Sequence, residues 1–314
     1  MALYLVTGGA GFIGSHIVEE LVRRGESVRV LDNLSTGHEK NLSSVRGQID
    51  FRTADIRDLE SIRPHFDGVD YVIHLAALAS VAHSMKDPVE TTLVNLNGAL
   101  HVLLAARDAH AKRLVIAATC GAYGDDPVLP RVETQVPQPL SPYALTKVAN
   151  EYYGQIFNRY FGLEVVSLRY FNVFGPRQDP ESPYTGVLSI FIASYLRGIT
   201  PIIFGDGEQS RDFTYVSNVV DATLLAIQSS AASGKIINIG TGISCTLNQT
   251  IAQLNSILGV EVTPRYDAPR LGDVRHSTAD ISLALETLGY EPRVSFEEGL
   301  RCTIEWLRAA CAGV

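Results

Sequence analysis

The sequence predicts an α/β protein, in which a doubly wound parallel sheet is followed by a smaller mixed α/β domain. Strand-like runs alternate with helix-period stretches as far as about Tyr170, and this alternation is typical of a parallel sheet covered by helices on both faces. A glycine-rich segment at 8–14 joins the first apolar run to the first helical stretch. The length of 314 residues allows about two domains of ordinary size.

The strands of the sheet are predicted where short runs rich in Val, Ile, Leu and Tyr occur. Six such runs suggest six or seven strands, and they lie at residues 3–7, 27–32, 49–53, 70–76, 112–119 and 164–170. Helical patterns lie between them at 12–24, near 58–66, at 88–109 and at 142–161. After Tyr170 the alternation loosens, with frequent Pro and Gly at 175–207. We therefore predict one domain over 1–170 and a second over 171–314, with segments near 209–235 returning to the first.

Composition and charge exclude several classes of protein. With 46% hydrophobic and 19% charged residues the chain is globular, and its net charge of −8 argues against nucleic acid or an anionic membrane as a partner. The sequence contains no apolar run of about 18 residues and no basic signal-peptide start. Its cysteines form no C-x-x-C pair, so we expect no disulfide framework, no metal site and a cytoplasmic location; they are Cys120, Cys245, Cys302 and Cys311.

The glycine segment predicts a nucleotide-binding turn. Gly8 permits a tight turn, Gly11 lets a diphosphate approach the backbone N–H groups at the helix start, and Gly14 lets the helix pack close to the strand. An ordinary turn is the alternative, but three glycines at this spacing directly after the first strand favour a Rossmann-like sheet.

Asp32 is the candidate contact for the adenosine ribose. It ends the second predicted strand, and Asn33 rather than Arg follows it, which favours NAD over NADP. The segment DNLSTG at 32–37 is also rich in turn-forming residues, so a plain turn is the alternative role for Asp32.

A tyrosine and a lysine form the candidate acid–base pair. Ser141 and Pro142 are typical of a helix start, and Tyr143 and Lys147 then lie on one face of that helix. A nearby ammonium favours the phenolate and lowers a tyrosine pKa from about 10, so Tyr143 becomes usable as an acid and base near neutral pH. Such pairs also arise by chance on amphipathic helices, and only the preceding glycine motif favours the catalytic interpretation.

Together these residues resemble the extended short-chain dehydrogenase/reductases, and within them the UDP-hexose 4-epimerases, closest to the UDP-N-acetylglucosamine 4-epimerase group. The similarity covers nearly the whole chain, and its later blocks are more specific than the glycines. It includes TGGAGFIG at 7–14, DNLSTG at 32–37, HLAA at 74–77, VNLNG at 94–98, RYFNVFGPRQ at 169–178, GDGEQSRDF at 205–213 and GDVRHS at 272–277.

The resemblance implies that residues 1–170 bind NAD and that residues 171–314 bind a UDP-sugar. It assigns the cofactor contacts to Gly8, Gly11, Phe12, Ile13, Gly14, Asp32, Asn33, Ser35, Thr36, Gly37, Asp55, Ile56, Leu75, Ala76, Ala77, Asn95, Ala117, Tyr143, Lys147 and Tyr170.

The resemblance also implies the reaction, an inversion at C4 of the sugar without net oxidation. Tyr143 removes the 4-hydroxyl proton while the C4 hydride passes to NAD, and the resulting 4-keto sugar turns beneath an anchored UDP before the hydride returns. Thr119 hydrogen-bonds the 4-oxygen and relays the proton, and with Tyr143 and Lys147 it completes the catalytic set. A β-branched residue that merely ends a strand is the alternative for Thr119.

The substrate contacts come from the same resemblance. Arg211 and Arg270 hold the diphosphate, for which paired guanidinium bonds are suited, and Asp273 accepts from the uridine ribose. A surface ion pair is the alternative for each arginine. The full implied set is Ala79, Ser80, Val81, Thr119, Tyr143, Asn172, Val187, Leu188, Ile202, Phe204, Arg211, Arg270, Asp273 and Ser277.

Small residues beside the implied sugar site separate this chain from its neighbours. Dehydratases of the family carry an Asp-Glu pair, and decarboxylases a Glu, where Cys120 and Gly121 stand here. We expect Cys120 to be a small core residue. Members restricted to UDP-glucose and UDP-galactose carry a large Tyr at the position of Ser277 and a Lys in the segment of Ala79, so the small Ser277 implies UDP-GlcNAc and UDP-GalNAc as substrates. A small surface residue in a loop is the alternative for Ser277.

Other functions stay open at this stage. A UDP-glucuronate 4-epimerase would use the same Thr, Tyr and Lys, and a sensor that binds NAD and a nucleotide sugar would need no proton relay. The helices at 88–109 and 142–161 carry apolar residues on more than one face, which is typical either of core packing or of the helix-bundle homodimer that the resemblance implies.

Overall fold

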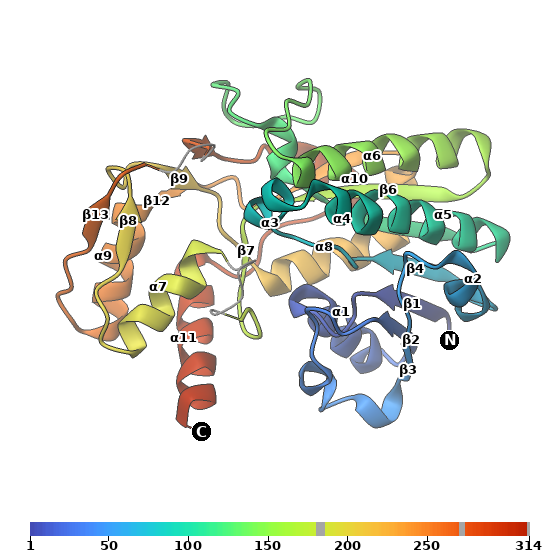
Figure 1. Ribbon diagram of the computed structural model, residues 1–314, viewed down its shortest axis with the longest axis horizontal. Helices are drawn as coiled ribbons and strands as arrows, with labels where there is room; N and C mark the ends of the chain where they lie inside the picture. Colours follow the sequence, from blue (N-terminus) through green and yellow to red (C-terminus); the bar gives the residue numbers. More distant parts are fainter. Residues whose placement is uncertain (180–185, 270–273, 313–314) are drawn as a thin grey trace.

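A seven-stranded sheet forms the centre of the computed structural model, which describes residues 1–179, 186–269 and 274–312 (Figure 1). Its strand order is β11-β6-β5-β4-β1-β2-β3, and every pairing is parallel. The six predicted strands are confirmed. The seventh comes from late in the chain, and the strands are β1 (Leu3–Thr7), β2 (Ser27–Asp32), β3 (Asp50–Thr53), β4 (Tyr71–His74), β5 (Arg113–Thr119), β6 (Glu164–Tyr170) and β11 (Ile236–Ile239).

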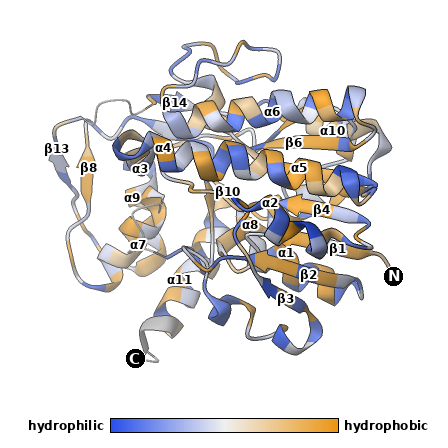
Figure 2. Ribbon diagram, turned by 45° about the vertical axis from the view of Figure 1, so that its right-hand side comes forward, coloured by the Kyte–Doolittle hydropathy of each residue, from blue (hydrophilic) through white to orange (hydrophobic). Residues whose placement is uncertain are grey.

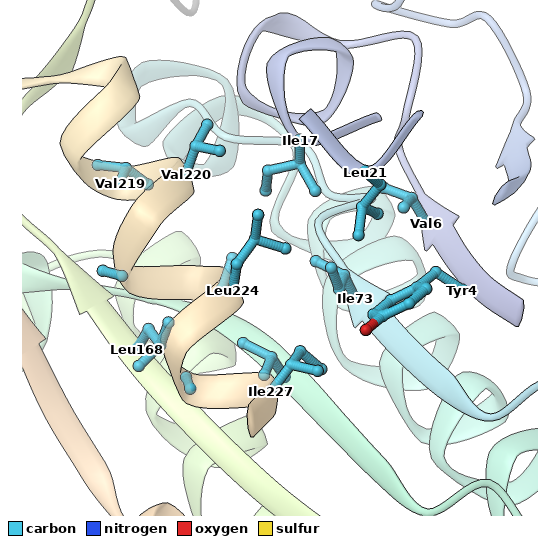
Figure 3. Close-up of a cluster of buried hydrophobic side chains, with 14 of the residues drawn as sticks. Tyr4, Val6, Ile17, Leu21, Ile73, Leu168, Val219, Val220, Leu224 and Ile227 are labelled. Atoms are coloured by element: carbon cyan, nitrogen blue, oxygen red, sulfur yellow. The ribbon is translucent and has the colours of Figure 1, made fainter. Parts of the chain in front are cut away.

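Both faces of the sheet are buried under helices. On one face, Val6 and Ile73 pack with α1 (Phe12–Arg23) and α8 (Val216–Gln228), as Figure 3 shows. On the other face, Leu5 and Val72 pack with α5 (Ala99–Asp108) and α6 (Pro142–Tyr160). Successive strand residues point to opposite faces, and in Figure 2 the hydrophobic strands lie beneath helices whose outer surfaces are partly hydrophilic. The predicted doubly wound, Rossmann-like fold is therefore confirmed.

Two predicted helices are subdivided in the structure. The stretch near 58–66 forms α2 (Leu59–Ile62) and a 3-10 turn (Arg63–Phe66). The stretch 88–109 begins as α4 (Pro88–Thr92), widens into a π-helical turn (Leu93–Gly98) and continues as α5. A π-turn is rare and is often found at functional sites. This one contains Asn95, a predicted cofactor contact.

The later part of the chain forms short elements around a separate core. Three small sheets pair as β10-β7, β12-β9-β14 and β13-β8. Their strands are β7 (Val173–Phe174), β8 (Ile202–Phe204), β9 (Ser210–Arg211), β10 (Thr214–Tyr215), β12 (Cys245–Thr246), β13 (Arg265–Asp267) and β14 (His276–Ser277). The helices among them are α7 (Val187–Leu196), α9 (Leu247–Leu258) and α11 (Phe296–Ala312). Side chains such as Phe174, Phe191 and Leu254 form the core of this part.

Three elements from this later stretch belong to the large sheet. Strand β11 pairs with β6 at its edge, and α8 packs against α1, β5 and β6. Helix α10 (Ser282–Leu288) packs against β11 and α8. The division of the chain at residue 170 stays a prediction. In the part of the chain that the structure describes, no helix is long and apolar enough to cross a membrane.

Candidate active site

The glycine turn after β1 is packed so tightly that Gly8 and Gly14 leave no room for a side chain. Gly8 has φ +70°, and a Cβ on it would lie 2.7 Å from the Ala76 nitrogen. A Cβ on Gly14 would lie 2.2 Å from the Gly8 carbonyl oxygen. Gly11 precedes α1 and offers no capping side chain, so Phe12, Ile13 and the residues after them present the helix N-terminus that binds a diphosphate well. These residues fit a dinucleotide.

Asp32 lies at the carboxyl end of β2 and is 7% exposed. Its Oδ2 accepts from the Ala10 N–H at 3.0 Å and its Oδ1 from the Leu34 N–H at 2.8 Å. Each oxygen keeps further acceptor capacity for a ribose hydroxyl. Burial raises the pKa of Asp32.

The segment after Asp32 leads toward a second acidic residue. Asn33 donates to the Asp55 carboxylate at 3.0 Å, and Arg57 lowers the pKa of Asp55 to about 2. Ile56 is buried beside Asp55. The structure thus brings predicted cofactor residues from two loops together at one edge of the sheet, while Ser35 and Thr36 are exposed and Gly37 is buried.

Asn95 fixes the segment that leaves β4. Its Oδ1 accepts from the Leu78 N–H at 2.8 Å and its Nδ2 donates to the Leu78 carbonyl at 3.0 Å. This segment contains Leu75, Ala76 and Ala77 and leads to α3 (Val81–Lys86). Its N-cap is Ser80, which accepts from the His83 N–H at 3.0 Å, while Ala79 and Val81 are exposed.

The predicted catalytic residues meet between β5 and α6. Ser141 caps α6 by accepting from the Ala144 N–H at 3.2 Å, which sets the first turn that carries Tyr143. Thr119 ends β5, and its hydroxyl lies near the Tyr143 phenol and accepts from the Gly121 N–H at 3.1 Å. Lys147 is 3% exposed and donates to the Ala117 carbonyl at 2.9 Å.

The pKa values in this group differ from the sequence expectation. Lys147 was expected to lower the pKa of Tyr143, but burial raises the pKa of Tyr143 to about 12. Burial also lowers the pKa of Lys147 to about 8. The expectation was wrong for the protein alone because both groups are desolvated and the ammonium of Lys147 is bonded to a carbonyl group. Desolvation opposes each charged form.

Tyr170 points toward the helical layer beneath the sheet. Its hydroxyl is hydrogen-bonded to Thr223 of α8 at 2.8 Å, and it packs in the same core as Val219 and Leu224. Burial raises its pKa. The structure therefore shows a core role for its ring, and its predicted contact with the cofactor stays a prediction.

Three of the predicted substrate residues on the later part of the chain lie on short segments that contact one another. Asn172, at φ +29°, donates from its side chain to the Asp212 carbonyl at 3.1 Å. Ser277 is 7% exposed and pairs with Arg211 across β14 and β9. The Arg211 guanidinium donates to the Ser210 carbonyl at 2.9 Å.

Of the other predicted substrate residues on the later part of the chain, four lie on α7 and β8 and two lie outside the described residues. Val187 and Leu188 begin α7, and Ile202 and Phe204 are the first and last residues of β8. Arg270 and Asp273 lie outside the described residues.

Cys120 was expected to be a small core residue, and it packs against the buried cluster of Tyr123, Phe171 and Ala279. It follows Thr119 in a 3-10 turn (Cys120–Tyr123). Its thiol also lies near Asn172 and Ser277, and burial raises the pKa of the thiol. Cys120 therefore links the catalytic strand to the predicted sugar pocket. Its proximity to Ser277 was not predicted, and its place directly after Thr119 was the one local signal for it.

Comparison with known proteins identifies the family. Residues 4–240 match the model of the NAD dependent epimerase/dehydratase family. The chain belongs to this family. The predicted extended short-chain dehydrogenase/reductase of the UDP-hexose 4-epimerase type is thereby confirmed, together with its NAD cofactor and its class as an isomerase.

Three relatives in the family illustrate its range of sugars. The UDP-glucose 4-epimerase of Thermotoga maritima, solved with UDP-glucose, has a TM-score of 0.94 and 44% identity, with 98% of this chain and 99% of that chain covered. The UDP-N-acetylglucosamine 4-epimerase of Methanobrevibacter ruminantium has a TM-score of 0.94 and 38% identity over the same shares. A UDP-glucuronate 4-epimerase of Thermodesulfobacterium geofontis is 34% identical over 318 residues, 98% of this chain and 96% of its relative. The three names specify three different sugars.

Proposed function

We propose that the protein interconverts UDP-GlcNAc and UDP-GalNAc, with UDP-glucose and UDP-galactose as further substrates. The observation that carries the proposal is Ser277, a small side chain at a buried position that pairs with Arg211 across β14 and β9 and lies near the Cys120 thiol. A large residue there would fill the space next to the catalytic strand. The small side chains of Cys120 and Ser277 leave that space open for an acetamido group.

The catalytic steps are assigned to three side chains. NAD, when bound, supplies the acceptor and donor of the C4 hydride. Tyr143 takes and returns the proton of the 4-hydroxyl group, and Thr119 lies near enough to its phenol to share one proton path. Lys147, one helical turn after Tyr143, favours the phenolate when its ammonium is charged. Thr119 donates to the 4-oxygen as negative charge develops there.

The nucleotide is held by residues of the later part of the chain. Arg211 and Arg270 bind the diphosphate, and Asp273 accepts from the uridine ribose. Asn172 and the apolar residues of α7 and β8 complete the cradle. Anchoring UDP while the sugar stays free lets the 4-keto sugar present its other face.

The substrate proposal is tested by incubating the purified protein with UDP-GlcNAc, without added reductant, and separating the products by chromatography. A UDP-GalNAc peak is expected. Faster turnover of UDP-glucuronate would replace the proposal with a uronate epimerase. No product from any UDP-hexose would favour a sensor.

Ser277→Tyr tests the pocket itself. The larger side chain should abolish UDP-GlcNAc turnover and spare UDP-glucose turnover, because only the acetamido group needs the space. Ser277→Ala is the matched control and should retain both. Equal loss of the two activities in Ser277→Tyr, measured as initial rates, would contradict the assignment.

We also propose a homodimer formed through α6 and its neighbours. Leu145, Tyr152 and Ile156 recur along one side of α6 and are 58%, 53% and 43% exposed. Leu93, in the π-turn packed against α6, is 44% exposed.

A cytoplasmic location is supported by Cys120, Cys245 and Cys302, which are free thiols in the described part of the chain.

Light scattering after size-exclusion chromatography measures the assembly. The protein should have twice the mass of its 34.1 kDa chain, and Ile156→Glu should reduce it to one chain by placing a charge in the apolar face. Val260→Glu, at a 42% exposed position outside this face, should leave the mass unchanged. A wild-type mass of one chain would rule out the dimer.

A further inference from the structure

Asp212 is a fully buried carboxylate in the motif that carries Arg211. It is 0% exposed and directly follows β9. Four donors reach its two oxygens: the Thr241 N–H at 2.8 Å, the Thr241 hydroxyl at 2.7 Å, the Gly242 N–H at 2.9 Å and the Ala279 N–H at 3.1 Å. All four are uncharged, so the carboxylate is stabilised by hydrogen bonds aimed at it.

These bonds join segments that are far apart in the sequence. Thr241 and Gly242 follow β11 of the large sheet, and Ala279 follows β14, which carries Ser277. The Asp212 carbonyl group also accepts from the Asn172 side chain at 3.1 Å. One residue therefore ties the ends of β6, β9, β11 and β14 together, and the space is tight because a Cβ on Gly240 would lie 2.8 Å from Asp212 Oδ2.

The local strands offer little other support. Strand β9 has two residues and shares two residue pairs with β12 and two with β14. Such short ladders supply few backbone hydrogen bonds, whereas the Asp212 side chain adds four. Loss of the Asp212 carboxylate would leave all four of its donors without an acceptor. Unsatisfied buried groups shift the surrounding backbone or admit water.

We propose that Asp212 is a positioning residue for the nucleotide site, which fixes Arg211 relative to Asn172 and Ser277. The inference rests on the proposed role of Arg211 in holding the diphosphate of UDP. The Asp212 side chain is fully buried at the end of β9. It therefore acts by holding the backbone of Arg211 and of the segments bonded to it in place. Its loss should weaken binding of the nucleotide while leaving proton transfer between Tyr143 and Thr119 in place.

Asp212→Asn tests this role with nearly the same shape. The amide keeps one acceptor oxygen and turns NH₂ toward N–H donors, so the two loops must separate from β9. Calorimetric titration of the NAD-loaded protein with UDP should show binding weakened about 10-fold or more. The KM for the UDP-sugar should rise, kcat should fall by less than about 3-fold and NAD content should be unchanged. Asp67→Asn, an exposed acid in the NAD-binding part, is the matched control and should bind UDP normally.

A double-mutant cycle with Arg211→Ala separates positioning from general destabilisation. In the Arg211→Ala background, Asp212→Asn should weaken UDP binding by less than about 3-fold, because its effect passes through the missing guanidinium. The same fold-loss in both backgrounds would overturn the proposal. If Asp212→Asn fails to fold, Thr241→Val, which removes one hydroxyl donor, takes its place in the same cycle with a smaller expected loss.

The cycle also distinguishes the two levels of inference. If Arg211→Ala alone binds UDP as tightly as the wild type, the proposed nucleotide site is wrong. If Arg211→Ala weakens binding but the Asp212 effect is fully additive, the nucleotide site stands and the positioning role fails.

Discussion

Thr119 ends a strand of seven residues that is paired on both sides, by β4 and β6, whereas Arg211 lies on a strand of two residues. Tyr143 and Lys147 share the 19-residue helix α6. Ser277, by contrast, lies on the two-residue strand β14. The groups proposed to exchange a proton are therefore carried by long elements, a central strand and a helix packed against it, which suits the close tolerance of acid–base chemistry. The groups proposed to receive the nucleotide sugar are carried by short strands held through side-chain bonds.

The two regions also differ in how deeply their ion pairs are buried. Glu151 and Arg169 form an ion pair at 2.8 Å between α6 and β6, and both side chains are 1% exposed. Arg275 and Asp206, in the later part of the chain, form a pair at 2.7 Å with both side chains 54% exposed. The distances are alike, so burial decides what each pair contributes. The first holds the catalytic helix against the sheet, and the second is screened by water.

The largest effect is expected at the proton path. Tyr143→Phe removes the phenolic hydroxyl but keeps the ring, so turnover should fall by about 1,000-fold while NAD stays bound. Initial rates of UDP-hexose interconversion and the NAD content of the purified variant measure the two quantities. Tyr153→Phe, on the same helix, is the control. Normal activity in Tyr143→Phe would show that the region of β5 and α6 does not owe its proton transfer to this phenol.

The contrast between the two ion pairs is tested by urea unfolding. Glu151→Gln leaves the Arg169 guanidinium buried without its counter-ion and should lower the free energy of unfolding by about 3 kcal/mol. The Tyr123 ring, 4.7 Å from the Arg169 guanidinium carbon, compensates only in part. Asp206→Asn should leave the free energy of unfolding unchanged within error. Equal effects in both variants would show that burial is not the deciding difference.

A smaller effect is expected in the pH dependence of stability. Lys147 has its pKa lowered from 10.5 to about 8 in the folded protein, so between these pH values the unfolded chain binds the extra proton and stability rises with pH. The contribution from pH 8 to 10 is about 2 kcal/mol. Above pH 10 the raised pKa of Tyr143, about 12, acts in the opposite direction.

Lys147→Met isolates the lysine contribution. Urea unfolding of NAD-free protein at pH 8, 9 and 10 should show a steeper rise in stability for the wild type than for the variant. Lys112→Met, at an exposed lysine directly before β5, should follow the wild type. Parallel curves for wild type and Lys147→Met would show that the ammonium is not desolvated.

Local spacing accounts for what the sequence predicted well. Short runs rich in Val, Ile, Leu and Tyr indicated six strands, the glycines indicated the turn before α1, and the i, i+4 spacing placed Tyr143 and Lys147 on one helical turn. The rest depends on contacts between distant segments. Nothing local in Ile236–Ile239 indicates that it pairs with β6, and nothing near Cys120 indicates that Ser277 reaches its sulfur.

The place of β11 at the edge of the sheet has a consequence for biosynthesis. When a ribosome has released the chain as far as Tyr170, β6 has β5 on one side and an open row of backbone groups on the other. Its partner β11 and the helix α8 that covers Leu168 are still to be made. At about 5 to 20 residues per second, the wait to Ile239 lasts on the order of 3 to 14 s. During that interval the nascent edge is a template for wrong strand pairing, so a fragment ending at Tyr170 should aggregate where one extending beyond Ile239 should not.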